Sequence, residues 1–146
     1  MGRVVNTDGA GAERNRLRRT IAEALRLLGQ KQTIDAEARD LAALIVYSLR
    51  GIAQGVDTSA AAWEKRDYYM KADRFRQEWA WVEAAARQLE VVLVREKWSD
   101  LPMVLALLLP RFSDIKLTKM TRTAELWNGC YEKLLKEGAR EKAAAR

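Results

Sequence analysis

Apolar residues recur along most of the chain at the three- and four-residue spacing of amphipathic α-helices. Residues 12–28 carry one apolar stripe, and Gly29 follows as a left-handed helix cap. Thr33 is placed to cap a second helix that ends at Gly55. The stripe of this second helix consists of Leu41, Leu44, Ile45, Ser48, Leu49 and Ile52. The pattern therefore predicts two amphipathic helices before residue 56.

The most regular periodicity lies between residues 60 and 97, where neither Gly nor Pro interrupts the chain. Apolar positions there alternate steps of four and three, as in the seam of a helical bundle. They are Tyr68, Ala72, Phe75, Trp79, Val82, Ala86, Leu89 and Leu93. We therefore expect one long central helix over about 60–97.

Two shorter helices complete the predicted all-α fold, a four- or five-helix bundle. A Leu-rich segment at about 100–109 is apolar on every side, so we expect it to be buried and stopped by Pro110. A last helix begins between Ser113 and Thr123 and ends near Gly138. Its apolar positions are Met120, Ala124, Trp127, Tyr131 and Leu134.

The length of 146 residues fits one domain, expected over 12–138 between a flexible leader, 1–11, and a fraying tail, 139–146. The longest apolar stretch falls short of the ~20 residues that span a bilayer, and the N-terminus lacks a signal-peptide pattern. Cys130 is the only cysteine, which excludes an intrachain disulfide. These features predict a cytoplasmic protein without a membrane partner.

The absence of histidine narrows the possible functions. It excludes imidazole general bases, Ser-His and Cys-His nucleophiles and His-ligated metals. No phosphate-binding glycine loop or cysteine pair is present. A carboxylate site for Mg²⁺ at Glu64, Asp67 and Glu125 is an alternative, but acids scattered along amphipathic helices usually form solvated faces. We expect neither enzyme activity, nor a cofactor, nor a metal.

The formal net charge of +6 is unevenly distributed. Residues 1–32 carry seven Arg or Lys against three acids, and residues 111–123 carry four against one. A local excess of positive charge attracts polyanions more than a uniform excess does. Nucleic acid is therefore the first expected partner, followed by acidic protein surfaces and anionic lipid.

Two of the candidate contact groups are mainly basic. The first contains Arg14, Arg16, Arg18 and Arg19, and is either a phosphate contact or the solvated face of the first helix. The second contains Arg111, Lys116, Lys119 and Arg122, interleaved with threonine hydroxyls that also bind phosphate oxygens. The alternative for this second group is a solvated basic loop.

The third candidate group combines aromatic and basic side chains. Residues 63–81 hold six of the eleven aromatic residues, beside Lys65, Arg66, Lys71, Arg74 and Arg76. Exposed aromatic rings stack on unpaired bases. Since the seam positions are expected in the core, Trp63, Tyr69 and Trp81 are the rings that we expect at a ligand.

These observations predict a non-catalytic accessory subunit that binds RNA or single-stranded DNA through phosphate contacts. We expect it in a homo-oligomer or with larger protein subunits, inside a ribonucleoprotein or other nucleic-acid-processing assembly. The expected size, charge and architecture are similar to those of small accessory proteins of ribonucleoprotein machines, an analogy that transfers no residue. The alternative is a protein-protein adaptor that docks an acidic partner without nucleic acid.

Overall fold

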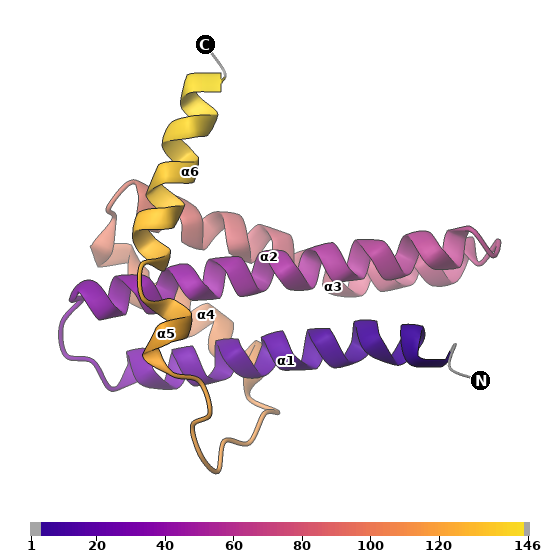
Figure 1. Cartoon of the computed structure of the whole chain (residues 1–146), viewed down its shortest axis with the longest axis horizontal. Helices are drawn as coiled ribbons and strands as arrows, with labels where there is room; N and C mark the ends of the chain where they lie inside the picture. The colour runs from indigo at the N-terminus through magenta and orange to yellow at the C-terminus, as the bar shows by residue number, and fades with distance from the viewer. Residues whose placement is uncertain (1–3, 145–146) are drawn as a thin grey trace.

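The computed structural model describes residues 4–144 and contains only helices and connecting loops over that range (Figure 1). The elements are α1 (Val4–Gly29), α2 (Ala36–Glu64), α3 (Tyr69–Val94), the 3₁₀ turn η1 (Trp98–Asp100), α4 (Leu101–Phe112), α5 (Ala124–Trp127) and α6 (Cys130–Ala144). The predicted all-α bundle is confirmed. No helix in the described range is long and apolar enough to cross a membrane.

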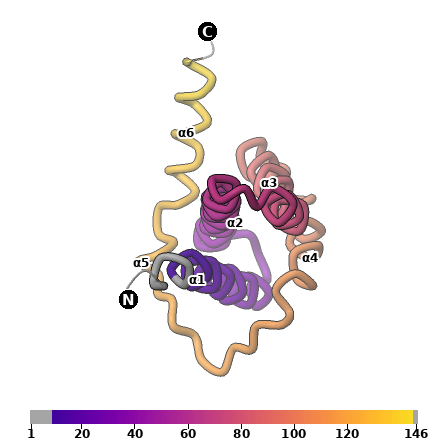
Figure 2. Tube along the Cα trace, turned by 90° about the vertical axis from the view of Figure 1, so that its right-hand side faces the viewer, coloured from indigo at the N-terminus to yellow at the C-terminus, as the bar shows by residue number. Residues whose placement is uncertain are grey.

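Helix α2 lies at the centre of the molecule, between α1 and α3 (Figure 2). It also contacts α5 and α6. All six positions of its predicted apolar stripe are buried, as expected for a helix covered on several sides. The central helix is therefore α2, and not the segment 60–97 that the sequence pattern favoured.

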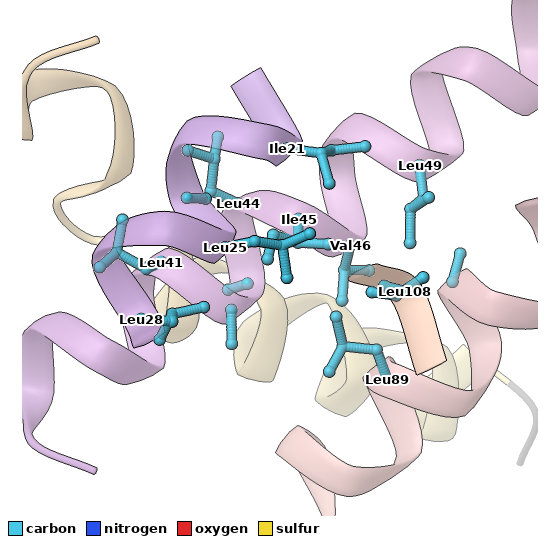
Figure 3. Packing of buried hydrophobic residues seen from close by; sticks show 14 of the residues in the cluster. Ile21, Leu25, Leu28, Leu41, Leu44, Ile45, Val46, Leu49, Leu89 and Leu108 are labelled. Carbon is cyan, nitrogen blue, oxygen red and sulfur yellow. The ribbon is translucent and has the colours of Figure 1, made fainter. Parts of the chain in front are cut away.

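The core forms where α1, α3 and α4 meet the first half of α2 (Figure 3). Helix α1 contributes Ile21, Leu25 and Leu28, while α3 contributes Leu89 and α4 contributes Leu108. Burying a side chain of this size stabilises the fold by about 1.5–3 kcal/mol. The apolar stripe predicted for the first helix is confirmed from Ile21 to Leu28, and Leu17 packs at its half-buried edge.

The long helix expected over 60–97 is interrupted at residues 65–68, where the chain turns back from α2 into α3. Asp67 has a positive φ of 64°, and its N–H bonds to the Glu64 carbonyl at 3.0 Å. The Tyr68 N–H bonds to the Trp63 carbonyl at 2.9 Å, which completes a Schellman turn. The prediction was wrong because this turn uses Asp, one of the few residues other than Gly that tolerates a left-handed conformation.

Within α3, the seam predicted from the alternating spacing is largely buried. Ala72, Val82, Ala86, Leu89 and Leu93 are in the core, and Phe75 and Trp79 pack against it from half-buried positions. Tyr68 is exposed because it lies in the turn, before the first residue of α3. The seam therefore begins at Ala72.

Other helix boundaries also differ from the expected ones. Asp35 caps α2, since its carboxylate accepts a hydrogen bond from the Ala38 N–H at 2.8 Å, and Thr33 lies outside the helix. Helix α2 continues through Gly55 to Glu64, and α1 begins at Val4. Residues 1–3 of the expected leader and 145–146 of the expected tail lie outside the described residues.

Helix α4 is amphipathic, whereas the sequence predicted burial on every side. Leu101, Val104, Leu108 and Phe112 are buried, but the opposite side of the helix lies at the surface. Its large exposed apolar side chains are Met103, Leu107 and Leu109. The helix also continues past Pro110 to Phe112.

Residues 113–123 form no helix and arc around α1 from α4 to α5; we call this segment the strap (Figure 2). The single last helix expected after it is split into α5 and α6 near Gly129, whose φ is +83°. Helix α6 continues through Gly138 to Ala144 and projects away from the bundle (Figure 1). Met120, assigned to the last helix, lies in the strap.

Candidate nucleic-acid interface

Arginines of α1 hold the strap by hydrogen bonds to its backbone carbonyls. Arg19 donates to the Lys119 carbonyl at 2.8 Å, and Arg26 donates to the Leu117 carbonyl at 3.0 Å. Arg18 donates to the Arg111 carbonyl, next to the strap, at 2.8 Å. A carbonyl oxygen orients a guanidinium group without neutralising it, so these contacts fix the strap. Arg18 and Arg19 are also paired with carboxylates, whereas Arg26 forms no ion pair within the described part of the chain.

Glu23 provides the strap with a buried acceptor. Its side chain is 1% exposed and accepts hydrogen bonds from the Thr121 N–H, the Arg122 N–H and the Thr121 hydroxyl at 2.7–2.9 Å. Arg19 Nε donates to the same carboxylate at 2.9 Å. Burial by itself raises the pKa of Glu23, but the bonds from Arg122, Thr121 and Arg19 outweigh burial and lower that pKa to about 2. Glu23 is therefore ionised, and both of its carboxylate oxygens are occupied by the strap and Arg19.

Two of the predicted contact residues use most of their donors inside the protein. Arg122 donates to the Thr20 hydroxyl at 3.1 Å and to the Arg16 carbonyl at 2.9 Å. Arg18 forms an ion pair with Asp114 at 2.6 Å. Both side chains are largely buried, so their geometry is that of residues that position the strap.

Apart from Arg14, which lies over Phe75 and Trp79 of α3, the first two candidate groups lie on adjacent segments. We call these segments the α1–strap face: residues 13–26 of α1 together with residues 111–123. It contains nine Arg or Lys against three acids, a net charge of +6 that equals the net charge of the whole chain. Its solvent-exposed cations are Arg16, Arg26, Arg111, Lys116 and Lys119. Of these, Arg16 is paired with Glu13 at 2.5 Å. Positive charge is thus concentrated on one part of the folded surface.

A continuous series of five aromatic rings runs from the end of α2 to the end of α4; we call it the aromatic ladder. Its members are Trp63, Phe75, Trp79, Trp81 and Phe112, and successive ring centroids are 4.9, 6.4, 6.2 and 5.9 Å apart. No spacing rule in the sequence indicates this series, because it joins rings from three helices.

Cations lie over the rings of the aromatic ladder. Lys71 is 4.5 Å from the Trp63 centroid, and Arg111 is 4.5 Å from the Trp81 centroid. Arg14 lies over Phe75 and Trp79 at 5.0 and 5.4 Å. Trp63 and Trp81, which the sequence suggested as base-stacking rings, therefore already have internal neighbours.

The turn between α2 and α3 exposes a second surface, the hairpin tip, residues 65–74. Tyr68, Tyr69 and Met70 are 55%, 61% and 72% exposed. Lys65, Arg66, Lys71 and Arg74 are exposed as well, and none of them forms an ion pair within the described part of the chain. The sequence indicated Tyr69 here, whereas Tyr68 was assigned to the core.

The described residues contain no group of three or more Asp, Glu, His or Cys side chains that could hold a metal ion. Glu64, one of the acids considered for Mg²⁺, instead pairs with Arg76 at 2.7 Å. Neither a protein-family model, nor a curated protein, nor a solved structure matches the chain. Function is therefore inferred from the α1–strap face and the hairpin tip.

Proposed function

We propose that the protein is a non-catalytic nucleic-acid-binding subunit that holds the phosphate backbone of RNA or single-stranded DNA on the α1–strap face. The observation that supports this function is the concentration of the chain's entire net charge of +6 on that face. Cationic side chains bind nucleic acid chiefly by displacing the counterions condensed on its phosphates. Such a surface positions a strand without reading its sequence.

Preorganisation of the α1–strap face supports the same proposal. Arg26 is already fixed by the Leu117 carbonyl and has no acidic partner in the described residues, so less side-chain freedom is lost when a phosphate binds. Arg19 is fixed in the same way by the Lys119 carbonyl, but it also pairs with Glu23. Lys116 and Lys119 project from the strap as exposed cations. The arginines held by the strap and the exposed lysines together offer several cations to one polymer backbone.

A role as a protein-protein adaptor is the second candidate, supported by helix α4. Its exposed Leu109 lines a groove of about 580 Å³, together with mainly apolar residues of α1, α4 and the loop between α1 and α2. Met103 and Leu107 are exposed on the same helix outside this groove. Exposed apolar patches of this kind mark protein contacts. Within the proposed function, this face contacts another subunit of the assembly. As an adaptor alone, the protein would bind neither single-stranded nor duplex oligonucleotides at moderate salt.

The proposal is tested by changing Lys116 and Lys119 together to Gln. We expect the dissociation constant for a single-stranded RNA to rise about fivefold to tenfold, and the slope of log affinity against log salt to decrease by about 2. Fluorescence anisotropy over a salt series measures both values. Arg122 is left unchanged because its bonds to Thr20 and Arg16 hold the strap.

The matched control removes two exposed charges from the turn after α3, by changing Arg95 and Lys97 to Gln. This variant has the same net charge as the test variant, so it should retain nearly the affinity of the original protein. Equal losses in the two variants would show that only total charge matters. Unchanged binding in the strap variant would exclude the α1–strap face as the contact.

A further inference from the structure

Two adjacent tyrosines at the hairpin tip are exposed by a rigid turn. The Tyr68 N–H bonds to the Trp63 carbonyl, and the Tyr68 carbonyl accepts from the Ala72 N–H at 3.0 Å. The backbone on both sides of Tyr68 is therefore fixed by the ends of α2 and α3. Tyr68 and Tyr69 are more than half exposed, as is Met70, whereas the seam of α3 from Ala72 to Leu93 is buried or half-buried.

The charged residues around these tyrosines partly balance, so the hairpin tip would bind a ligand through short-range contacts more than through long-range electrostatic attraction. Lys65 and Arg66 precede the tyrosines, and Lys71 and Arg74 follow them. Asp67 and Asp73 lie in the same segment, which leaves residues 65–74 with a net charge of only +2. A ligand held mainly by net charge would prefer the α1–strap face, whereas the hairpin tip offers aromatic faces with cations at their sides.

The aromatic ladder links the hairpin tip to the strap. It begins at Trp63, two residues before the tip, and ends at Phe112, directly before the strap. Lys71 lies over the first of the five rings, and Arg111 lies over Trp81 near the other end. Phe112 is buried and the other four rings are half-buried, so the ladder is a packed connection between the hairpin tip and the strap.

We infer that the hairpin tip is a stacking site for unpaired bases and that Tyr68 and Tyr69 make the protein prefer single strands over duplexes. This inference rests on the proposed binding of phosphates by the α1–strap face. A duplex hides the faces of its bases, so tyrosine rings can stack only on a single strand. An anionic membrane is a weaker fit, because docking would press the exposed Asp67 carboxylate at the turn against lipid phosphates.

The test compares a double change of Tyr68 and Tyr69 to Ala with a double change of both to Phe, which keeps the rings. The probes are a single-stranded RNA of about 20 nucleotides and the duplex of the same sequence. We expect the Ala variant to lose about tenfold to a hundredfold in single-strand affinity, while duplex affinity stays within about twofold. The Phe variant should retain the single-strand preference. Val91→Ala, an exposed apolar change on α3 away from the hairpin tip, serves as the control for surface truncation.

The outcomes separate this inference from the proposed function. Equal losses on single strand and duplex, or no loss on either, would overturn stacking at the tip while leaving phosphate binding intact. Loss of the preference in the Phe variant would also overturn it. Binding to vesicles of anionic phospholipid that depends on both tyrosines, without a change in RNA affinity, would assign the tip to a membrane instead. Failure of the unaltered protein to bind either nucleic acid would overturn both proposals.

Discussion

Glu23 shows how one residue can determine the shape of the binding surface. Its carboxylate accepts two backbone N–H groups and a hydroxyl from Thr121 and Arg122, so the strap is fastened to α1 at a buried point. A buried carboxylate is stable only when donors of this kind replace its hydration. The position of Lys119 and Met120 relative to α1 follows from this attachment.

We expect Glu23→Gln to destabilise the protein by about 2–3 kcal/mol, because the amide N–H group would replace Oε2, which accepts from Arg19 Nε and the Thr121 hydroxyl, and the charge that pairs with Arg19 would be lost. Urea unfolding measures the loss, and hydrogen exchange of Thr121 and Arg122 shows whether the strap detaches. Glu23→Asp, which keeps the charge on a shorter side chain, is the control. An unchanged free energy of unfolding in the Gln variant would contradict this account.

The pH dependence of stability follows from the same carboxylate. The pKa of Glu23 in the folded protein is about 2, below the ordinary value of 4.5, so its stabilising effect is complete above about pH 4.5. That effect is lost as pH falls toward 2, where the folded state also takes up the proton. Unfolding free energies measured between these pH values should decrease more steeply in the original protein than in Glu23→Gln. Parallel curves would show that other groups dominate.

Sequence reasoning identified the charges of the first helix but not the role of Glu23. Glu23 lies among arginines on α1, where the pattern suggests a solvated acid, and its main partners lie 98 and 99 positions away. Trp81 was chosen as a ligand contact because it falls outside the seam, yet its ring lies between Trp79, Phe112 and Arg111. Long-range partners of this kind leave no local spacing in the sequence.

At the scale of elements, the ends of α2 and α3 use the same motif without glycine. Glu96 has a φ of 55°, and its N–H bonds to the Leu93 carbonyl, while the Lys97 N–H bonds to the Val92 carbonyl at 2.8 Å. The corresponding residue after α2 is Asp67, with a φ of 64°. Side chains with a Cβ are strained in this conformation, and Glu more so than Asp.

Glu96→Gly should therefore stabilise the protein by about 0.5–1 kcal/mol, since glycine adopts the left-handed conformation without strain. Asp67→Gly should give a smaller gain. Gln88→Gly, at an exposed position inside α3, is the control and should cost about 1 kcal/mol. Chemical denaturation measures the free energy of unfolding of each variant. A loss of stability in Glu96→Gly would show that the contacts of the Glu96 side chain stabilise the protein by more than the backbone strain destabilises it.

Local periodicity predicted the helices better than their ends. The stripes of α1 and α2 and most of the α3 seam were correct because burial repeats every three or four residues. Gly55 was taken as a terminator, but helix α2 continues through it because packing on both sides sustains the helix. Gly51 allows α1 and α2 to pack closely, since a Cβ at this position would lie 2.9 Å from Leu17 Cδ1. Helix ends depend on turns and tertiary contacts that the spacing does not contain.

At the scale of the whole molecule, the two candidate surfaces combine different physical properties. The α1–strap face supplies net charge, and the hairpin tip supplies exposed rings with little net charge. Helix α6 projects away from the bundle on the side opposite the strap (Figures 1 and 2). A fluorophore or fusion attached beyond α6 would therefore be remote from the strap.

A single-stranded RNA of about 20 nucleotides should raise the melting temperature of the protein at low salt, because it binds the folded α1–strap face and not the dispersed charges of the unfolded chain. The shift should shrink with added salt and be smaller in the variant that lacks Lys116 and Lys119. Differential scanning fluorimetry with and without RNA measures it. A salt-independent shift would point to a contact that is not electrostatic.

The strap and α1 are joined by hydrogen bonds between residues about 100 positions apart in the chain, such as Arg19 and Lys119. A fragment that carries either segment keeps its cations but loses their mutual spacing. Proteolytic cleavage within the strap would accordingly change the relative positions of the cations on the α1–strap face, although no residue would be removed. A shortened or rearranged form of the protein would therefore keep this surface only if it retained both α1 and the strap.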